Sequence, residues 1–182
     1  YDGGHITLSS SRVARWTSTK RAVALSLMGI NFDREDVGYW QPSEQPTTMS
    51  VMDSVIESID GSGIEVGYGD LQMVRTLVTD IRRNLDISGD GIWVMGVPEL
   101  QRTVQLKQCA FSHAGRSGIL SNGADIQVLD SRVSANQVGL VALEGGVITT
   151  DDKTLVIDNI QTEQGSETFP LPDAPTSVPD AL

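Results

Sequence analysis

One motif recurs four times along the chain, and each copy ends in glycine followed by an aliphatic residue. The copies occupy Met49–Val66, Leu71–Val94, Val104–Ser121 and Ile126–Ala142. An internal repeat of this length indicates one structural unit stacked on the next, so it constrains the fold more than any other feature of a sequence. The repeat therefore predicts a solenoid.

Aligning the four copies gives columns of similar residues. The opening aliphatic column is Met49, Leu71, Val104 and Ile126, and a second is Val51, Met73, Leu106 and Val128. A column of small residues is Ser54, Thr76, Cys109 and Ser131. A later apolar column is Ile56, Val78, Phe111 and Val133. The copies close with Gly63-Ile64, Gly91-Ile92, Gly118-Ile119 and Gly139-Leu140. We expect the apolar columns to fill a dry interior and the small residues to mark an inward corner. The glycines are expected at a bend that needs positive φ or close backbone approach.

The pattern within each copy is that of strands. Apolar residues alternate over short stretches that are rich in Val, Ile and Thr, and Gly, Ser, Asp and Asn interrupt these stretches. Successive copies begin 22, 33 and 22 residues apart, and a turn of about 22 residues at ~3.3 Å per residue suits a coil with three faces. We predict an all-β chain forming a single-stranded parallel β-helix of about five to seven coils. A polar column of Ser50, Gln72, Gln105 and Gln127 faces outward, as either a short glutamine ladder or an ordinary solvated face.

The segment Asp53–Val66 (DSVIESIDGSGIEV) has the residue pattern of a known family of repeats. It resembles the right-handed β-helix repeat of pectin-lyase-like proteins, a superfamily that includes pectate lyases, polygalacturonases, phage tailspikes and bacterial surface proteins. In style it is closest to the secreted bacterial surface repeat proteins. The resemblance covers roughly residues 49–142 and implies a right-handed helix. It implies little about function, because one fold carries many functions.

The chain is expected to be one domain with irregular ends. Residues 1–160 are predicted to form the β-helix, with regular coils over 49–142, degraded coils at both ends and an excursion over 33–48. Residues 161–182 are predicted to be a proline-rich tail or cap, because this segment contains Pro170, Pro172, Pro175 and Pro179 and has little periodicity.

Charge and composition limit the partners and the compartment. The 182 residues carry a formal net charge of −11, which excludes the basic face that nucleic-acid binding needs. This charge fits an extracellular or cell-surface location, with a virion tail as the alternative. No run of 18 apolar residues occurs, so no membrane insertion is expected. The single cysteine, Cys109, falls in the small-residue column and is expected to be buried.

The coil of 33 residues, 71–103, is the candidate binding region. It has about six surplus residues before Gly91 and about five after it, which predicts a local protrusion or cleft wall. Alternation of Ile92 inward, Trp93 outward and Val94 inward places a tryptophan among charged groups, and carbohydrate sites combine aromatic, carboxylate and guanidinium groups in this way. The candidate binding residues are Arg82, Arg83, Asp86, Asp90, Trp93, Glu99 and Arg102, with His113 and Arg116 one coil further on. Tyr39 and Trp40 in the excursion are either a sugar-stacking pair or a loop folded over the solenoid.

The sequence lacks the catalytic signatures of the resembled enzymes. Polygalacturonase-like hydrolysis would need clustered aspartates with Gly-His-Gly and Arg-x-Lys, and a pectate-lyase-like site would need stacked acidic calcium ligands with an arginine base. The outward column Asp53, Arg75, Gln108 and Asp130 interrupts such a stack. Only two histidines occur, which makes a metal site unexpected. We therefore predict no catalytic residues, no cofactor and no metal.

Two functions remain open. The favoured one is a secreted or surface-exposed structural or interaction module within a larger assembly, with a protein partner or further copies of itself. The alternative is a carbohydrate-binding or carbohydrate-degrading protein, tailspike-like or polysaccharide lyase- or hydrolase-like, acting on an extracellular polysaccharide.

Overall fold

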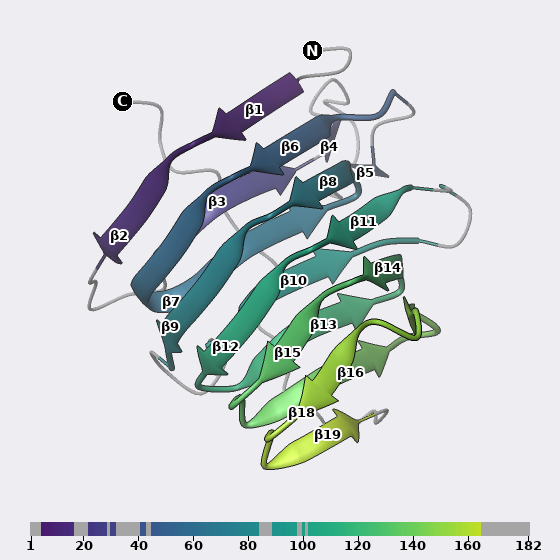
Figure 1. Ribbon diagram of the computed structural model, residues 1–182. Helices are drawn as coiled ribbons and strands as arrows, with labels where there is room; N and C mark the ends of the chain where they lie inside the picture. Colours follow the sequence, from purple (N-terminus) through teal and green to yellow (C-terminus); the bar gives the residue numbers. More distant parts are fainter. Residues whose placement is uncertain are drawn as a thin grey trace.

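The computed structural model describes residues 5–16, 22–28, 30–31, 41–42, 45–83, 89–97, 100 and 102–164. Across these residues the protein is all-β, with strands and turns and no helix. Figure 1 shows the strands following one another in chain order from the N-terminal to the C-terminal end of the stack. Of the described strands, only β4 (Ile30–Asn31) and β5 (Gln41–Pro42) pair antiparallel.

The remaining strands form parallel sheets A, B and C. The six strands of sheet A are β1 (His5–Ser9), β6 (Thr48–Met52), β8 (Asp70–Val74), β11 (Val104–Lys107), β14 (Asp125–Leu129) and β17 (Val147–Thr150). Sheet B contains β2 (Arg12–Trp16), the first part of β7 (Val55–Gly67), β9 (Leu77–Arg82), β12 (Ala110–Ala114), β15 (Arg132–Ser134) and β18 (Leu155–Ile157). Sheet C contains β3 (Ala22–Met28), the second part of β7, β10 (Ile92–Met95), β13 (Ser117–Asn122), β16 (Val138–Leu143) and β19 (Gln161–Gln164). Because β7 passes through the corner between B and C, these two sheets form one sheet of 11 strands.

We call one strand of A followed by one of B and one of C a coil. Each inner coil pairs with the coil before it and with the coil after it. The first coil is β1–β3 and the last is β17–β19. Pairing continues through Gln164, so strand structure extends past the predicted tail boundary at residue 160. The excursion at 33–48 and the proline-rich segment lie mostly or wholly outside the described residues.

The predicted columns are confirmed by the strand register. Met49 pairs with Leu71, Leu71 with Val104, and Val104 with Ile126. The column of Phe111 and the column of Ile92 stack in the same way, and all of their members lie in the main core. Stacking places like beside like, so each aliphatic side chain packs on the equivalent side chain of the next coil.

Hydrogen bonding explains the small-residue column. Ser54, Thr76, Cys109 and Ser131 are buried as predicted. Each side chain donates to the carbonyl two residues earlier, as Ser54 Oγ does to Met52 O at 2.7 Å. Between neighbouring coils the Cys109 amide donates to Ser131 Oγ at 3.0 Å. A short side chain with a donor and an acceptor is therefore what this corner requires.

The glycines and the bends differ in part from expectation. At Gly63 a Cβ atom would lie 2.5 Å from the Gly91 carbonyl oxygen, and at Gly91 it would lie 2.5 Å from that of Gly118, so close backbone approach explains this column. Positive φ instead occurs at non-glycine residues in two outward columns. The first column, at the corner between sheets A and B, is Asp53, Arg75, Gln108 and Asp130, with φ of 47 to 54°. The second, near the far side of sheet B, is Arg15, Ser58, Asp80, His113, Ala135 and Asp158, with φ of 52 to 61°.

Candidate functional site

The two insertions of the 33-residue coil are confirmed by the register. Ile59 and Ile64 are five residues apart, whereas their partners Ile81 and Ile92 are eleven apart. After β10 the chain takes nine residues from Met95 to Val104, against four between their partners Gly67 and Leu71. The surplus is therefore six residues before Gly91 and five after it. Residues 84–88, 98, 99 and 101 within it lie outside the described part of the chain.

Trp93 was expected on the surface, and that expectation is wrong. The alternation itself is confirmed, since Ile92 and Val94 lie in the main core and Trp93 is on the opposite face of sheet C. Its side chain is nevertheless only 1% exposed. It belongs to a second apolar cluster that consists of Trp93, Leu120, Val138, Val141 and Leu143. Burial in this cluster makes Trp93 a packing residue.

Asp90 and Arg116 are also buried instead of facing outward. Asp90 is 0% exposed and forms an ion pair with the Arg116 guanidinium, which is 3% exposed. Arg116 Nε lies 2.9 Å from Asp90 Oδ1, and Ser117 Oγ donates to the same oxygen at 2.5 Å. A buried carboxylate needs such partners because burial removes its hydration. This pair anchors the end of the first insertion to the next coil.

Arg82 and Arg83 are exposed as predicted. Arg82 Nε lies 3.0 Å from Asp60 Oδ1 and 3.8 Å from Asp80 Oδ1, within a surface charge network on sheet B. Asp86, Glu99, Tyr39 and Trp40 lie outside the described residues. Among the described candidates, Asp90 pairs with Arg116 and Arg82 with Asp60, so these charges have partners within the stack.

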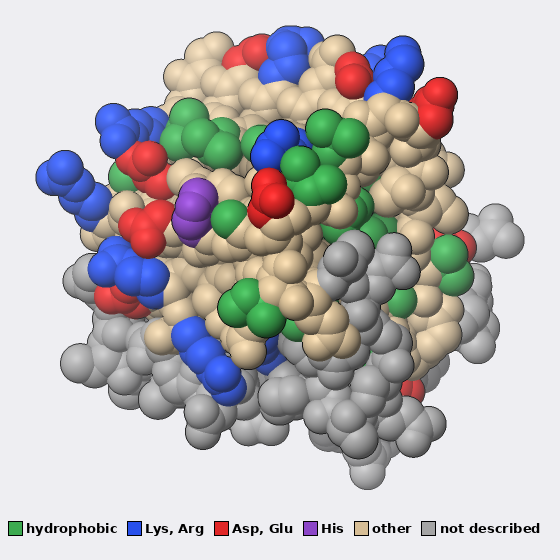
Figure 2. All heavy atoms as spheres, turned by 60° about the horizontal axis from the view of Figure 1, so that its bottom comes forward, with side chains coloured by type: hydrophobic (Ala, Val, Ile, Leu, Met, Phe, Trp, Pro, Cys, Tyr) green, Lys and Arg blue, Asp and Glu red, His purple; other side chains and the backbone are tan. Residues whose placement is uncertain are grey.

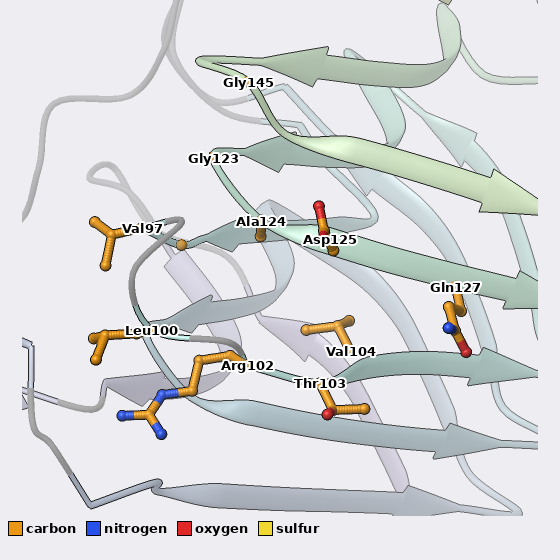
Figure 3. A pocket seen from close by; sticks show the side chains of 11 residues that line it. Val97, Leu100, Arg102, Thr103, Val104, Gly123, Ala124, Asp125, Gln127 and Gly145 are labelled. Carbon is orange, nitrogen blue, oxygen red and sulfur yellow. The ribbon is translucent and has the colours of Figure 1, made fainter.

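Arg102 borders a cleft beside the second insertion, as Figure 3 shows. The cleft has a volume of about 470 Å³; Val97, Leu100 and Arg102 line it from the insertion, and Asp125 and Gln127 line it from β14. Arg102 Nε donates to the Tyr68 carbonyl oxygen at 3.1 Å, which holds this side chain at the cleft. Asp125 and Gln127 are exposed. They come from a regular coil, and no motif in the sequence marks them.

The polar column of sheet A continues the cleft along the outer face. Gln105 Nε2 donates to Gln127 Oε1 at 3.3 Å, so at this pair the column forms the glutamine ladder that was one of its two alternatives. A second hollow of about 360 Å³ shares Thr103 with the cleft and extends past Gln72 and Gln105 to His5. Together the two hollows offer guanidinium, carboxylate, amide and hydroxyl groups to a polar ligand.

The outward corner between sheets A and B is occupied by paired groups. Arg75 Nε and Nη2 lie 2.6 and 2.8 Å from the two carboxylate oxygens of Asp53. This bidentate bond holds the pKa of Asp53 below its usual range. Gln108 Nε2 donates to Asp130 Oδ2 at 3.0 Å. Within the described residues no group of three or more His, Cys, Asp or Glu side chains is placed to hold a metal ion.

The last coil exposes aliphatic side chains, which the repeat pattern does not predict. Val147 is 49% exposed, Leu155 48%, Ile157 37% and Ile160 88%. Figure 2 shows this end of the stack, where hydrophobic and charged side chains are interspersed. Ile157 continues the outward column of Thr79, Ser112 and Ser134. The change from hydroxyl to aliphatic in that column was the available signal.

Comparison with family models, with curated proteins and with solved structures finds no match to this chain. The described part of the chain contains no helix of the length and hydropathy that crossing a membrane would require.

Proposed function

We propose that the chain is a right-handed parallel β-helix of the pectin-lyase-like kind and acts as a secreted or surface-exposed interaction module within a larger assembly. Parallel sheets with continuous side-chain columns support the first part. The exposed aliphatic side chains of the last coil are the observation that carries the second.

The last coil has the character of a docking surface. In the inner coils the outward positions of β9, β12 and β15 include Thr79, Ser112 and Ser134, which are polar, whereas β18 places Ile157 in that column. The strands β17, β18 and β19 also end their sheets, so one edge of each has no further strand in the described stack. Uncovered strand edges with aliphatic side chains favour association with another protein.

The outward columns favour a structural role over catalysis. Asp53 has a lowered pKa and both of its carboxylate oxygens bind Arg75, so it is a poor proton donor or acceptor near neutral pH. Asp130 is likewise hydrogen-bonded to Gln108. The net charge of −11 suits a protein that resists nonspecific aggregation outside the cell.

Photo-crosslinking in cells that make the protein tests this proposal. A photoreactive phenylalanine analogue at Leu155, in the last coil, is expected to give a discrete protein adduct. The matched control carries the analogue at Gln127, in the cleft, and is expected to give none. Adducts from Gln127 alone, or no protein adduct from Leu155, would contradict the proposal.

A carbohydrate-binding or carbohydrate-degrading role is the second candidate, favoured by the cleft at Arg102. Its guanidinium, carboxylate and amide groups could hydrogen-bond an extracellular polysaccharide. Retention in electrophoresis gels containing acidic polysaccharides, together with release of reducing sugar, tests this. Arg102→Ala should abolish retention. Arg82→Ala also removes one positive charge, but on sheet B and away from the cleft, and it should leave retention unchanged. Equal loss in both variants would assign retention to net charge alone.

A further inference from the structure

The two ends of the stack are geometrically complementary. In sheet A the column of Ile126 begins at Ile6 in β1 and ends at Ile148 in β17. Sheets A, B and C are parallel throughout, so β1 of a second copy could pair with β17 as β17 pairs with β14. Ile6 is 42% exposed at the first coil, and Ile148 is only half-buried at the last, although both belong to an inward column. Stacking one copy on the other would cover both within the continued column.

The two ends also differ in the sign of their charge. The described residues of the first coil, within 5–16 and 22–28, include Arg15 and Arg12, which pairs with Glu57 of the next coil, and no acidic residue. In the last coil, over 147–161, Asp151, Asp152 and Asp158 outnumber Lys153. Opposite charges at the two ends favour head-to-tail contact and disfavour contact between like ends.

One column has charges of opposite sign at its two ends, and within the chain Asp158 Oδ2 lies 3.6 Å from Arg132 Nη2 of the preceding coil. Arg15 begins, and Asp158 ends, the positive-φ column that continues through Ser58, Asp80, His113 and Ala135. If a second copy continued the column, its Arg15 would occupy the position next to Asp158, one strand spacing away, about 4.8 Å. Asp53 and Arg75 occupy such neighbouring positions in the other positive-φ column, and their side chains form a bidentate ion pair.

We propose that copies of this chain associate head-to-tail, with the last coil of one against the first coil of the next and with Asp158 facing Arg15 across the contact. The proposal rests on the proposed interaction function and names a second copy as the partner. A contact of this kind joins two different surfaces, so it forms open-ended chains and not closed pairs.

Analytical ultracentrifugation of the full chain over a range of concentrations tests the proposal. The wild type is expected to grow beyond dimers as concentration rises and to dissociate with added salt. Arg15→Asp and Asp158→Arg should each weaken association about tenfold or more, because like charges then face each other. The double variant, or an equimolar mixture of the two single variants, should restore association.

Matched controls separate this contact from net charge. Lys107→Glu and Asp80→Arg make the same charge changes at exposed positions in the middle of the stack, and they should leave association unchanged. Circular dichroism checks that every variant is folded. A wild type that stays monomeric at high micromolar concentration would overturn the proposal, as would closed dimers that persist in Arg15→Asp. If Leu155 crosslinks to a different protein in cells while the purified chain stays monomeric, the interaction function holds and the partner is not a second copy.

Discussion

Phe111 shows how a single residue is supported by its column. It lies between Val78 and Val133 of the neighbouring coils and is 0% exposed. Replacing it by alanine leaves a cavity that two rigid neighbouring strands cannot close. We expect Phe111→Ala to lower the free energy of unfolding by about 3–5 kcal/mol, measured by urea denaturation. A loss below about 1 kcal/mol would mean that the interior is loosely packed at this coil.

Asp151 links stability to pH near the last coil. The pKa of Asp151 is held below its usual range. The hydrogen bond from the Thr154 hydroxyl contributes most to this, and the hydrogen bond from the Asp130 amide adds to it. A carboxyl whose pKa is lower in the folded than in the unfolded state stabilises the fold above its unfolded pKa of about 3.9, and this contribution is lost as pH falls through the folded pKa. Wild type should therefore be more stable than Asp151→Asn at pH 7, and the difference should shrink on acidification. A difference that does not vary with pH would show that Asp151 acts through shape alone.

At the scale of the element, the second insertion forms one wall of the cleft without contributing strands to the stack. Val97 and Leu100 line the cleft, and the Leu100 amide donates to the Val97 carbonyl oxygen at 3.0 Å in a local turn. Deleting residues 97–101 would restore the four-residue spacing seen between Gly67 and Leu71. Because β10 and β11 keep their partners, we expect the free energy of unfolding to change by less than about 1 kcal/mol while any polysaccharide retention is lost. If urea denaturation shows a loss of unfolding free energy well above about 1 kcal/mol, the loop contributes to the stability of the fold.

Strands and insertions were predictable because the repeat fixes which residues stack. The columns through Leu71, Phe111 and Ile92, and both surplus lengths, follow from spacing alone. The surroundings of Trp93 and Asp90 were not predictable, because alternation tells which face a side chain takes and not whether that face is covered. Asp90 is paired with Arg116 and Ser117 of the next coil, and a column alignment does not tell that these polar groups are buried as a pair instead of facing solvent.

At the scale of the whole molecule, the stack is close to one-dimensional. Each inner coil has a neighbour on both sides, whereas in the described structure the last coil has one neighbour, through the pairs β14–β17, β15–β18 and β16–β19. In such an arrangement stability is approximately a sum of the stability of each coil and of its contacts with the neighbouring coils. The last coil should therefore open more easily than the middle of the stack, even though its columns keep the same register.

Hydrogen exchange measures this gradient directly. Amides of β11, β12 and β13 should exchange near the rate of global unfolding, because two neighbouring coils cover them. Amides of β17 and β18 should exchange about a hundredfold faster or more, through local opening of one coil. Raising the protein concentration should slow exchange in β17 and β18, but not in Asp158→Arg, if head-to-tail contact covers this edge. Uniform exchange along the stack would mean that the coils unfold as one cooperative unit. If exchange in β17 and β18 does not depend on protein concentration, no second copy covers that edge.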